Sequence, residues 1–319
     1  MTGARQPCQP PAGGAAVTWR WQPGLPPDWL RQWQWHCRLA LAALRTPLAM
    51  LALAALLATL AGCATPKVLS PSQAQAVALN RQGMDSYAAG DWVRAQHAFD
   101  AALRLERAVE NEEGIALNLL NLAQCHQRLG KPELAAAMLD QLLDGGAVVF
   151  SPRHRAEAAL QHALLAFQRQ DMAAAERWQR DGVAICGDCA MAGKLRGLGA
   201  RLALQRGDAL AALTAAGEAL AKSGDDAVEK ANALRLQGAA QLALGQKPAA
   251  EAALLQALAL DKDGGLPDKV LQDLQLLGHA GADPAAQRRY WRRALAVAQA
   301  TGKAGAVKEI ESAMAALPQ

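Results

Sequence analysis

Apolar residues recur every three to four positions through most of the chain after residue 72, as in Ala116, Leu119, Leu120 and Ala123. This spacing places them on one face of an α-helix. Alanine and leucine dominate the apolar positions, whereas β-branched residues, which favour strands, are sparse. The pattern therefore predicts an all-α chain.

Short turns of similar sequence separate the helical segments at intervals of 36 to 40 residues. They begin at Gly90, Gly130, Gln170, Gly207, Gly245 and Gly281. Glycine readily adopts the left-handed conformation that ends a helix, and an aspartate or proline in the following positions starts the next one. The repeat predicts six helical hairpins, followed by a closing helix over Lys303 to Leu317.

The hairpins share a signature in which glycine or alanine lies in the first helix, and alanine, a large apolar residue and another small residue follow in the second. The best matches are Gly83, Ala95, Phe99 and Ala102 in the first repeat, and Gly238, Ala250, Leu254 and Ala257 in the fifth. This order resembles the tetratricopeptide repeat (TPR) family, over roughly residues 72–316. The resemblance implies a TPR-like α-solenoid; an irregular solenoid of another helical-hairpin family is the alternative.

A targeting signal precedes the repeats. Leu60-Ala61-Gly62-Cys63 closes an uncharged run from Thr46 to Pro66, and Arg38 and Arg45 lie upstream. A basic segment, an apolar segment and small residues before a cleavage site are typical of a signal peptide. The four residues resemble the lipobox of bacterial lipoproteins, which implies cleavage before Cys63 and fatty acyl chains such as palmitate on it. A transmembrane helix is the alternative, because a run of 21 uncharged residues is long enough to span a bilayer.

These features divide the chain into a leader (1–62), a lipidated cysteine with a short tether (63–72) and a helical repeat domain (73–319). The tether would reach at most about 30 Å when extended. Residue 64 is alanine rather than aspartate. By resemblance to Gram-negative sorting signals, this favours a lipid anchor on the periplasmic face of the outer membrane, within the bacterial cell envelope.

The basic charge of the chain lies in the leader. The whole chain has 33 Lys and Arg against 29 Asp and Glu, and residues 1–62 contain five Arg and one Asp, so that 28 residues of each sign remain. A balanced mature chain lacks the positive footprint expected for nucleic-acid binding. We therefore expect no nucleic-acid partner.

Cys186 and Cys189 form a C-x-x-C pair, which suggests redox exchange when it begins a helix in a βαβ fold. No strand is predicted nearby, and a metal site would need about four ligands. In an oxidising envelope the pair is expected to form a disulfide staple or to stay idle. We expect Asp188 to cap the next helix, and Cys125 to be a small core residue.

His154, Glu157 and His162 lie on one predicted helix, but their spacing differs from that of a zincin site. We interpret them as a solvated polar stripe. Neither Gly-x-Ser-x-Gly, nor a P-loop, nor His-Glu-x-x-His is present. The sequence thus predicts neither an enzyme, nor a metal site, nor a cofactor beyond the covalent lipid.

A concave groove is the remaining candidate site, because the repeat register directs one face of each first helix inward. The candidate groove residues are Asn80, Met84, Tyr87, Gln124, Gln127, Leu164, Phe167, Lys194, Arg201 and Arg235. An apolar start and a basic end suit an extended or helical peptide with an acidic part. The TPR family's carboxylate clamp is not reproduced, because Glu157 lies where a lysine is needed.

The sequence therefore predicts a membrane-anchored scaffold or assembly adaptor of the cell envelope, which binds another envelope protein or a peptide segment of one. Two other functions stay open. One is a thiol-disulfide redox factor that uses Cys186 and Cys189. The other is a purely structural subunit whose groove is filled by its own C-terminal helix.

Overall fold

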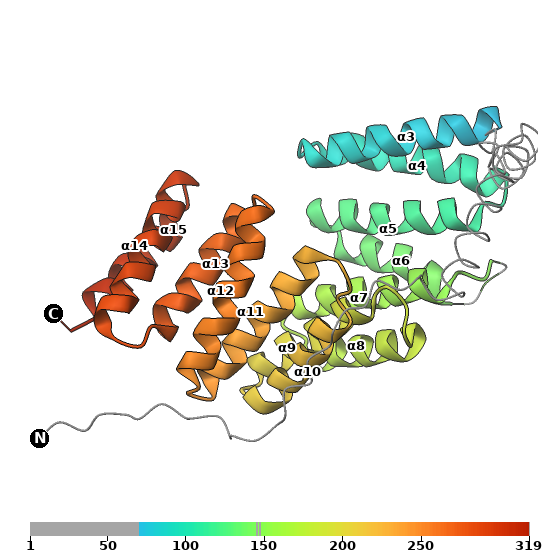
Figure 1. The fold of residues 1–319 in the computed structure, drawn as a ribbon. Helices are drawn as coiled ribbons and strands as arrows, with labels where there is room; N and C mark the ends of the chain where they lie inside the picture. Colours follow the sequence, from blue (N-terminus) through green and yellow to red (C-terminus); the bar gives the residue numbers. More distant parts are fainter. Residues whose placement is uncertain (1–69, 145, 147, 319) are drawn as a thin grey trace, which may run out of the picture. The chain divides into compact units, whose positions relative to one another are not determined.

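The computed structural model describes residues 70–144, 146 and 148–318. The predicted leader and Cys63 lie outside these residues. These described residues belong to one compact unit, in which they form thirteen α-helices and no strand (Figure 1). The helices are α3 (Pro71–Ala88), α4 (Trp92–Ala108), α5 (Glu112–Arg128), α6 (Pro132–Leu143), α7 (Pro152–Gln168), α8 (Met172–Cys186), α9 (Ala192–Gln205), α10 (Ala209–Ala221), α11 (Ala227–Ala243), α12 (Lys247–Asp263), α13 (Pro267–Ala280), α14 (Pro284–Ala300) and α15 (Ala304–Ala315).

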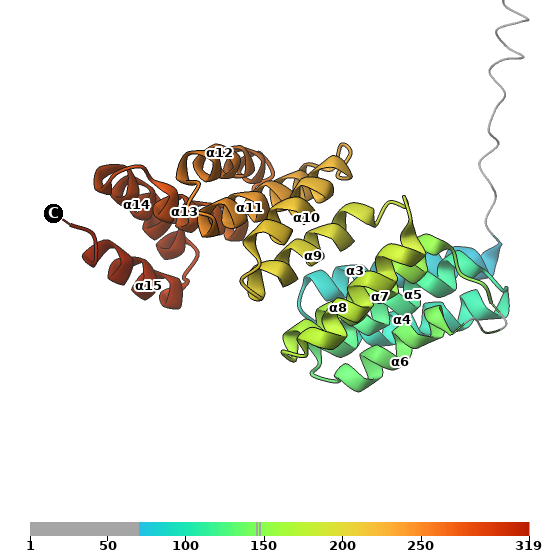
Figure 2. The ribbon, with the colours of Figure 1, turned by 90° about the horizontal axis from the view of Figure 1, so that it is seen from below.

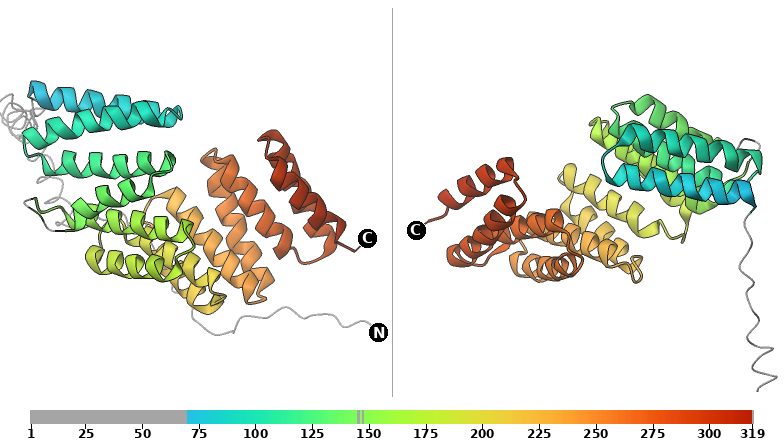
Figure 3. Two further views of the ribbon diagram at one scale, coloured as in Figure 1. Left: turned by 180° about the vertical axis from the view of Figure 1, so that it is seen from behind. Right: turned by 90° about the horizontal axis from the view of Figure 1, so that it is seen from above.

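Helices adjacent in sequence pack in pairs, from α3 with α4 to α13 with α14, and each pair packs against the next (Figures 1 and 2). Helix α15 packs on α14 at the C-terminal end of the stack, as the view from behind also shows (Figure 3). The six predicted hairpins and the closing helix are confirmed. The fold is an all-α, TPR-like solenoid.

In five of the six hairpins, the predicted turn residue adopts the left-handed backbone conformation. Backbone φ is positive at Gly90, Gly130, Gln170, Gly207 and Gly245, with values between 62° and 80°. The next helix is capped in three hairpins by an aspartate whose carboxylate accepts a hydrogen bond from a backbone N–H, as Asp91 does from Arg94 at 3.1 Å. Helix α6 begins instead with Pro132.

The sixth turn differs from the prediction. Gly281 has a φ of −48°, so it does not end α13 in the left-handed conformation. Glycine is needed there for space, since a Cβ would lie 2.8 Å from the backbone nitrogen of Gln287. Asp283 then caps α14 by accepting a hydrogen bond from the backbone N–H of Ala286 at 2.7 Å.

The core is built from alanines that let the helices approach closely, with one large side chain in many hairpins filling the space between them. Phe99 lies against Gly83, Leu254 against Gly238 and Trp291 against Gly278, and each of these large side chains is at most 4% exposed. Each pair joins the two helices of one hairpin. Burial of such side chains is the main contribution to stability in a helical stack.

The first described helix begins inside the segment predicted as the tether. Ser70 caps α3 by accepting a hydrogen bond from the backbone N–H of Gln73, and the side chain of Gln73 accepts one from the backbone N–H of Ser70. Among the described helices, none combines the length and the hydropathy needed to cross a bilayer.

Candidate peptide groove

Three cavities follow one another along the first helices of the six hairpins. We call them the amide cavity, the middle cavity and the basic cavity, with volumes of about 380, 650 and 520 Å³. All three share Leu164; the first two also share Gln168, and the last two share Arg201. Because neighbouring cavities share lining residues, we describe the three together as the groove.

The amide cavity is rich in carboxamides. It is lined by Tyr87, Gln124, Gln127, Arg128, Gln161, Leu164 and Gln168. Arg128 donates a hydrogen bond from Nε to the hydroxyl of Tyr87 at 3.2 Å, which fixes both side chains at the edge of the cavity. A carboxamide both donates and accepts, as does a peptide unit, so this cavity suits an extended backbone.

The middle cavity places a cation on an aromatic ring. The guanidinium carbon of Arg201 on α9 lies 4.6 Å from the ring centroid of Phe167 on α7. Such stacking holds the guanidinium in place while its N–H groups stay free at the ring edges. Gln170 and Gln205 add polar groups to the same cavity.

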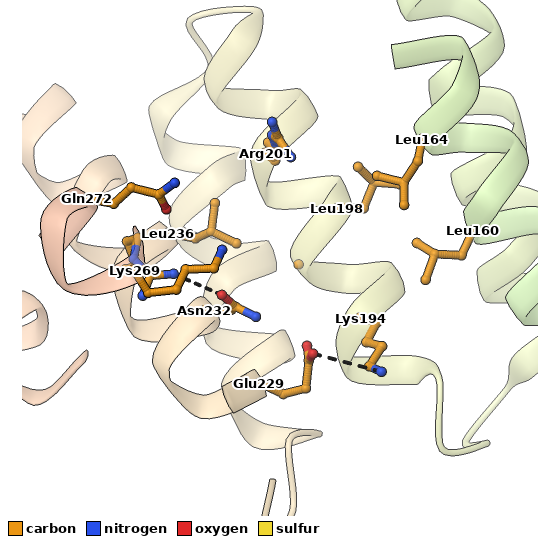
Figure 4. A pocket seen from close by; sticks show the side chains of 12 residues that line it. Leu160, Leu164, Lys194, Leu198, Arg201, Glu229, Asn232, Leu236, Lys269 and Gln272 are labelled. Carbon is orange, nitrogen blue, oxygen red and sulfur yellow. Dashed lines mark hydrogen bonds and ion pairs between the residues drawn. The ribbon is translucent and has the colours of Figure 1, made fainter. Parts of the chain in front are cut away.

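The basic cavity lies between α7 and α9 on one side and α11 and α13 on the other. Figure 4 shows Leu160, Leu164 and Leu198 facing it across from Lys269 and Gln272. Lys194 and Arg201 also line it. The cavity therefore combines an aliphatic wall with cations.

Arg235 differs from the prediction. It lines the basic cavity but is only 8% exposed, and its guanidinium pairs with Asp261 on α12 and, at 2.6 Å, with Asp273 on α13. Both carboxylates are at most 1% exposed. Burial, the largest cause, raises the pKa of Asp273 to about 7, while Arg235 opposes the rise. Arg235 thus joins three helices rather than offering a free charge at the end of the groove.

Eight of the ten predicted groove residues line the three cavities. The two others lie on α3 outside them: Asn80 donates a hydrogen bond to the buried Asn118 at 3.3 Å, and Met84 is 53% exposed. Lys269 and Gln161 line the groove but were not predicted. The register gave Gln161 no distinctive signal, and Lys269 lies on a helix for which no inward face was assigned.

The histidines of α7 do not form the predicted solvated stripe. His154 and His162 are 4% and 7% exposed. His154 Nε2 lies 3.4 Å from Glu113 on α5, and His162 Nε2 lies 3.0 Å from Asp140 on α6. His162 also stacks on Trp178 of α8, with ring centroids 4.3 Å apart. Burial lowers the pKa of His162, whereas Asp140 opposes the shift. These histidines join neighbouring helices.

A disulfide joins Cys186 and Cys189 at the turn between α8 and α9. Asp188 does not cap the next helix as predicted, because α9 begins only at Ala192; its carboxylate pairs instead with Lys222 at 2.8 Å. Cys125 is fully buried in the core. Among the described residues, no group of three or more His, Cys, Asp or Glu side chains is placed to hold a metal ion.

Comparison with known proteins relates the chain to repeat proteins. Residues 74–146, which include most of the first hairpin and all of the second, match the family model described as Tetratricopeptide repeat. No curated protein sequence matches the chain significantly. A chain of the APC/C hetero-tetramer Cut9-Hcn1 has a similar structure, with a TM-score of 0.56 and 14% identity over 75% of this chain and 43% of that one. The present chain therefore spans less than half of that relative.

Two other solved structures match with lower TM-scores. The C-terminal part of a TPR repeat-containing protein from Cytophaga hutchinsonii has 11% identity and a TM-score of 0.45, over 70% of this chain and 83% of that one. BtubC from P. vanneervenii has 16% identity and a TM-score of 0.43, over 79% and 95%. The family match and the fold together define the chain as a TPR-like solenoid.

Proposed function

We propose that this chain is a protein-interaction scaffold that binds a segment of another protein in the groove. One observation carries the proposal: the first helix of every hairpin contributes to a single groove. The six contributions include Tyr87 of α3, Gln124 of α5, Leu164 of α7, Arg201 of α9, Arg235 of α11 and Lys269 of α13. A groove of this kind holds an extended segment along its length, because successive cavities meet successive side chains.

Helix α15 lies outside the lining of the groove. Helix α15 buries Ile310 in a core cluster with residues of α12, α13 and α14, and no residue of α15 lines the three cavities. If the C-terminal helix filled the groove, residues of α15 would line these cavities. This arrangement favours the scaffold over the purely structural subunit.

A photo-crosslinking amino acid tests the scaffold. Placed at Gln124, it would capture the bound segment in cells; placed at Gln256, an exposed residue of α12 outside the cavities, it serves as the control. Leu164→Trp fills the junction of the three cavities. We expect an adduct at Gln124 that is absent at Gln256 and lost in Leu164→Trp. Identical adducts at both positions, or an adduct unaffected by Leu164→Trp, would refute the groove as the binding site.

We further propose that the scaffold is held at a membrane of the cell envelope through lipid on Cys63. The support is the sequence Leu60-Ala61-Gly62-Cys63 after an uncharged run. Two or more acyl chains hold a protein stably at a membrane, whereas one binds only marginally. In a bacterial host, the wild-type chain should take up a palmitate analogue, and Cys63→Ser should remain unlabelled and keep residues 1–62. An unlabelled wild-type chain that keeps its leader would refute the anchor.

A further inference from the structure

Five charged side chains line the basic cavity, and three of them are compensated by neighbours. Lys194 and Glu229 form an ion pair at 4.0 Å, which Figure 4 shows at one end of the cavity. Arg235 is paired with the two buried aspartates behind it. These pairs leave Arg201 and Lys269 as the charges that determine what the cavity attracts.

Arg201 and Lys269 have no carboxylate within 4.0 Å among the residues that the structure describes. Lys269 is half-buried, and burial, followed by the positive charge of Arg235, lowers its pKa. Asp261 and Asp273 oppose this lowering, whereas Arg201 adds to it. Two cations that face one cavity without a carboxylate in ion-pair contact form a site at which an anion is stabilised.

The wall opposite Lys269 is aliphatic. Leu160 and Leu164 of α7 and Leu198 of α9 face the cavity (Figure 4). Leu236 of α11 lies on the side of Lys269, beside the carboxamide of Asn232. A ligand that fits this cavity needs a negative group next to an apolar one. A bare inorganic anion would leave the leucines in contact with water.

We propose that the basic cavity binds an acidic side chain of a peptide between Arg201 and Lys269, with a neighbouring aliphatic side chain against Leu164 and Leu198. The proposal rests on the scaffold function proposed above. It specifies the recognised segment: an aspartate or glutamate next to leucine, isoleucine or valine. The anion lies inside the stretch of bound peptide, so the peptide needs no free C-terminus.

The test starts from a random peptide library displayed on phage and selected on the purified full-length chain. Selection on Leu164→Trp in parallel removes peptides that bind outside the groove. Each retained peptide is then synthesised with its acidic residue and with glutamine or asparagine in its place, and its affinity is measured by fluorescence anisotropy. Arg201→Met and Lys269→Met remove the two cations. Arg104→Met and Lys262→Met, at exposed positions outside the cavities, serve as matched controls.

We expect the groove-dependent peptides to be enriched in an acidic residue next to an aliphatic one. A hydrogen bond to a charged group contributes about tenfold or more in affinity, so the amide peptides and each cation variant should bind about tenfold more weakly. The control variants should bind as the wild type does. Circular dichroism melting shows whether each variant is folded, and a folded Arg201→Met alone suffices for the comparison.

Two results would overturn the proposal, and they are distinct. Groove-dependent peptides that bind equally well with glutamine in place of glutamate would refute the acidic subsite and leave the scaffold function intact. A library that yields no peptide retained by the wild type and lost in Leu164→Trp would refute both the subsite and the scaffold function.

Discussion

Gly83 of α3 lies directly against the ring of Phe99 of α4: a Cβ built on Gly83 would be 2.6 Å from Cε1 of Phe99. Phe99 is 1% exposed, so its ring is enclosed by neighbouring side chains. The same relationship recurs between Gly238 and Leu254, at 2.5 Å. The glycine and the large apolar residue of the repeat signature therefore pack against each other, and the glycine leaves the space that the large side chain fills.

Gly83→Ala should destabilise the chain by about 1–3 kcal/mol, because the added methyl overfills a packed contact. Urea unfolding followed by circular dichroism measures the loss. Gly217→Ala is the matched control, since a Cβ at this position of α10 meets nothing within 4 Å. The control should be neutral or more stable by up to about 1 kcal/mol, because alanine favours the helix. Equal stability of both variants would show that the contact in the first hairpin is loose.

Gln170→Gly should stabilise the chain by about 0.5–1 kcal/mol. Gln170 has a φ of 62°, a conformation that costs a non-glycine residue about 1–2 kcal/mol. Glycine removes this strain but adds freedom to the unfolded chain, so only part of the cost is recovered. Gln168→Gly, at the end of α7 in helical conformation, should instead destabilise by a similar amount. A lower melting temperature for Gln170→Gly than for the wild type would contradict this account.

The local sequence was sufficient to predict the hairpins. Helical periodicity and turn chemistry act over a few residues, and five predicted turn residues, from Gly90 to Gly245, have positive φ. Gly281 was wrongly predicted because its glycine is required by the close approach of Gln287, six positions along the chain. Local pattern cannot distinguish a glycine needed for backbone conformation from one needed for space.

Most of the groove residues named from the sequence line the three cavities, but the ion pairs of their charged side chains could not be predicted. The repeat register identified an inward face for the first helices of the first five hairpins, which suffices for Tyr87 or Leu164. It does not identify side chains that approach from other helices, so the pairing of Arg235 of α11 with Asp261 of α12 and Asp273 of α13 was missed. The burial of His162 of α7 was missed because its partners lie on other helices, Asp140 on α6 and Trp178 on α8.

Cys125 should resist alkylation in the folded chain. Burial, with a smaller contribution from Asp100, raises the pKa of its thiol to about 11, so little thiolate exists at pH 8. Iodoacetamide labelling followed by peptide mass spectrometry should leave Cys125 unmodified until urea opens the second hairpin. Cys186 and Cys189 are the internal comparison and should be labelled only after reduction. Rapid labelling of Cys125 in the native chain would show that α5 and α6 open easily.

Asp273 should make the stability of the C-terminal hairpins depend on pH. Its folded-state pKa of about 7 lies above the ordinary value of 3.8, so between these values the folded chain holds a proton that the unfolded chain has lost. The free energy of unfolding therefore falls as the pH rises from about 4 to about 7, and this contribution is constant above that range. The charged groups around Asp273 are Arg235, Asp261 and Lys269.

Asp273→Asn removes this titration, and its side-chain oxygen can still accept the hydrogen bond from Nε of Arg235. Relative to the wild type, the variant should gain stability on the order of 2 kcal/mol between pH 5 and pH 8, measured by urea unfolding at several pH values. Asp263→Asn controls for the loss of one carboxylate, because Asp263 is exposed and has no ion-pair partner among the described residues. If Asp273→Asn and the wild type showed parallel pH profiles, the buried carboxylate beside Arg235 would be ionised throughout this range.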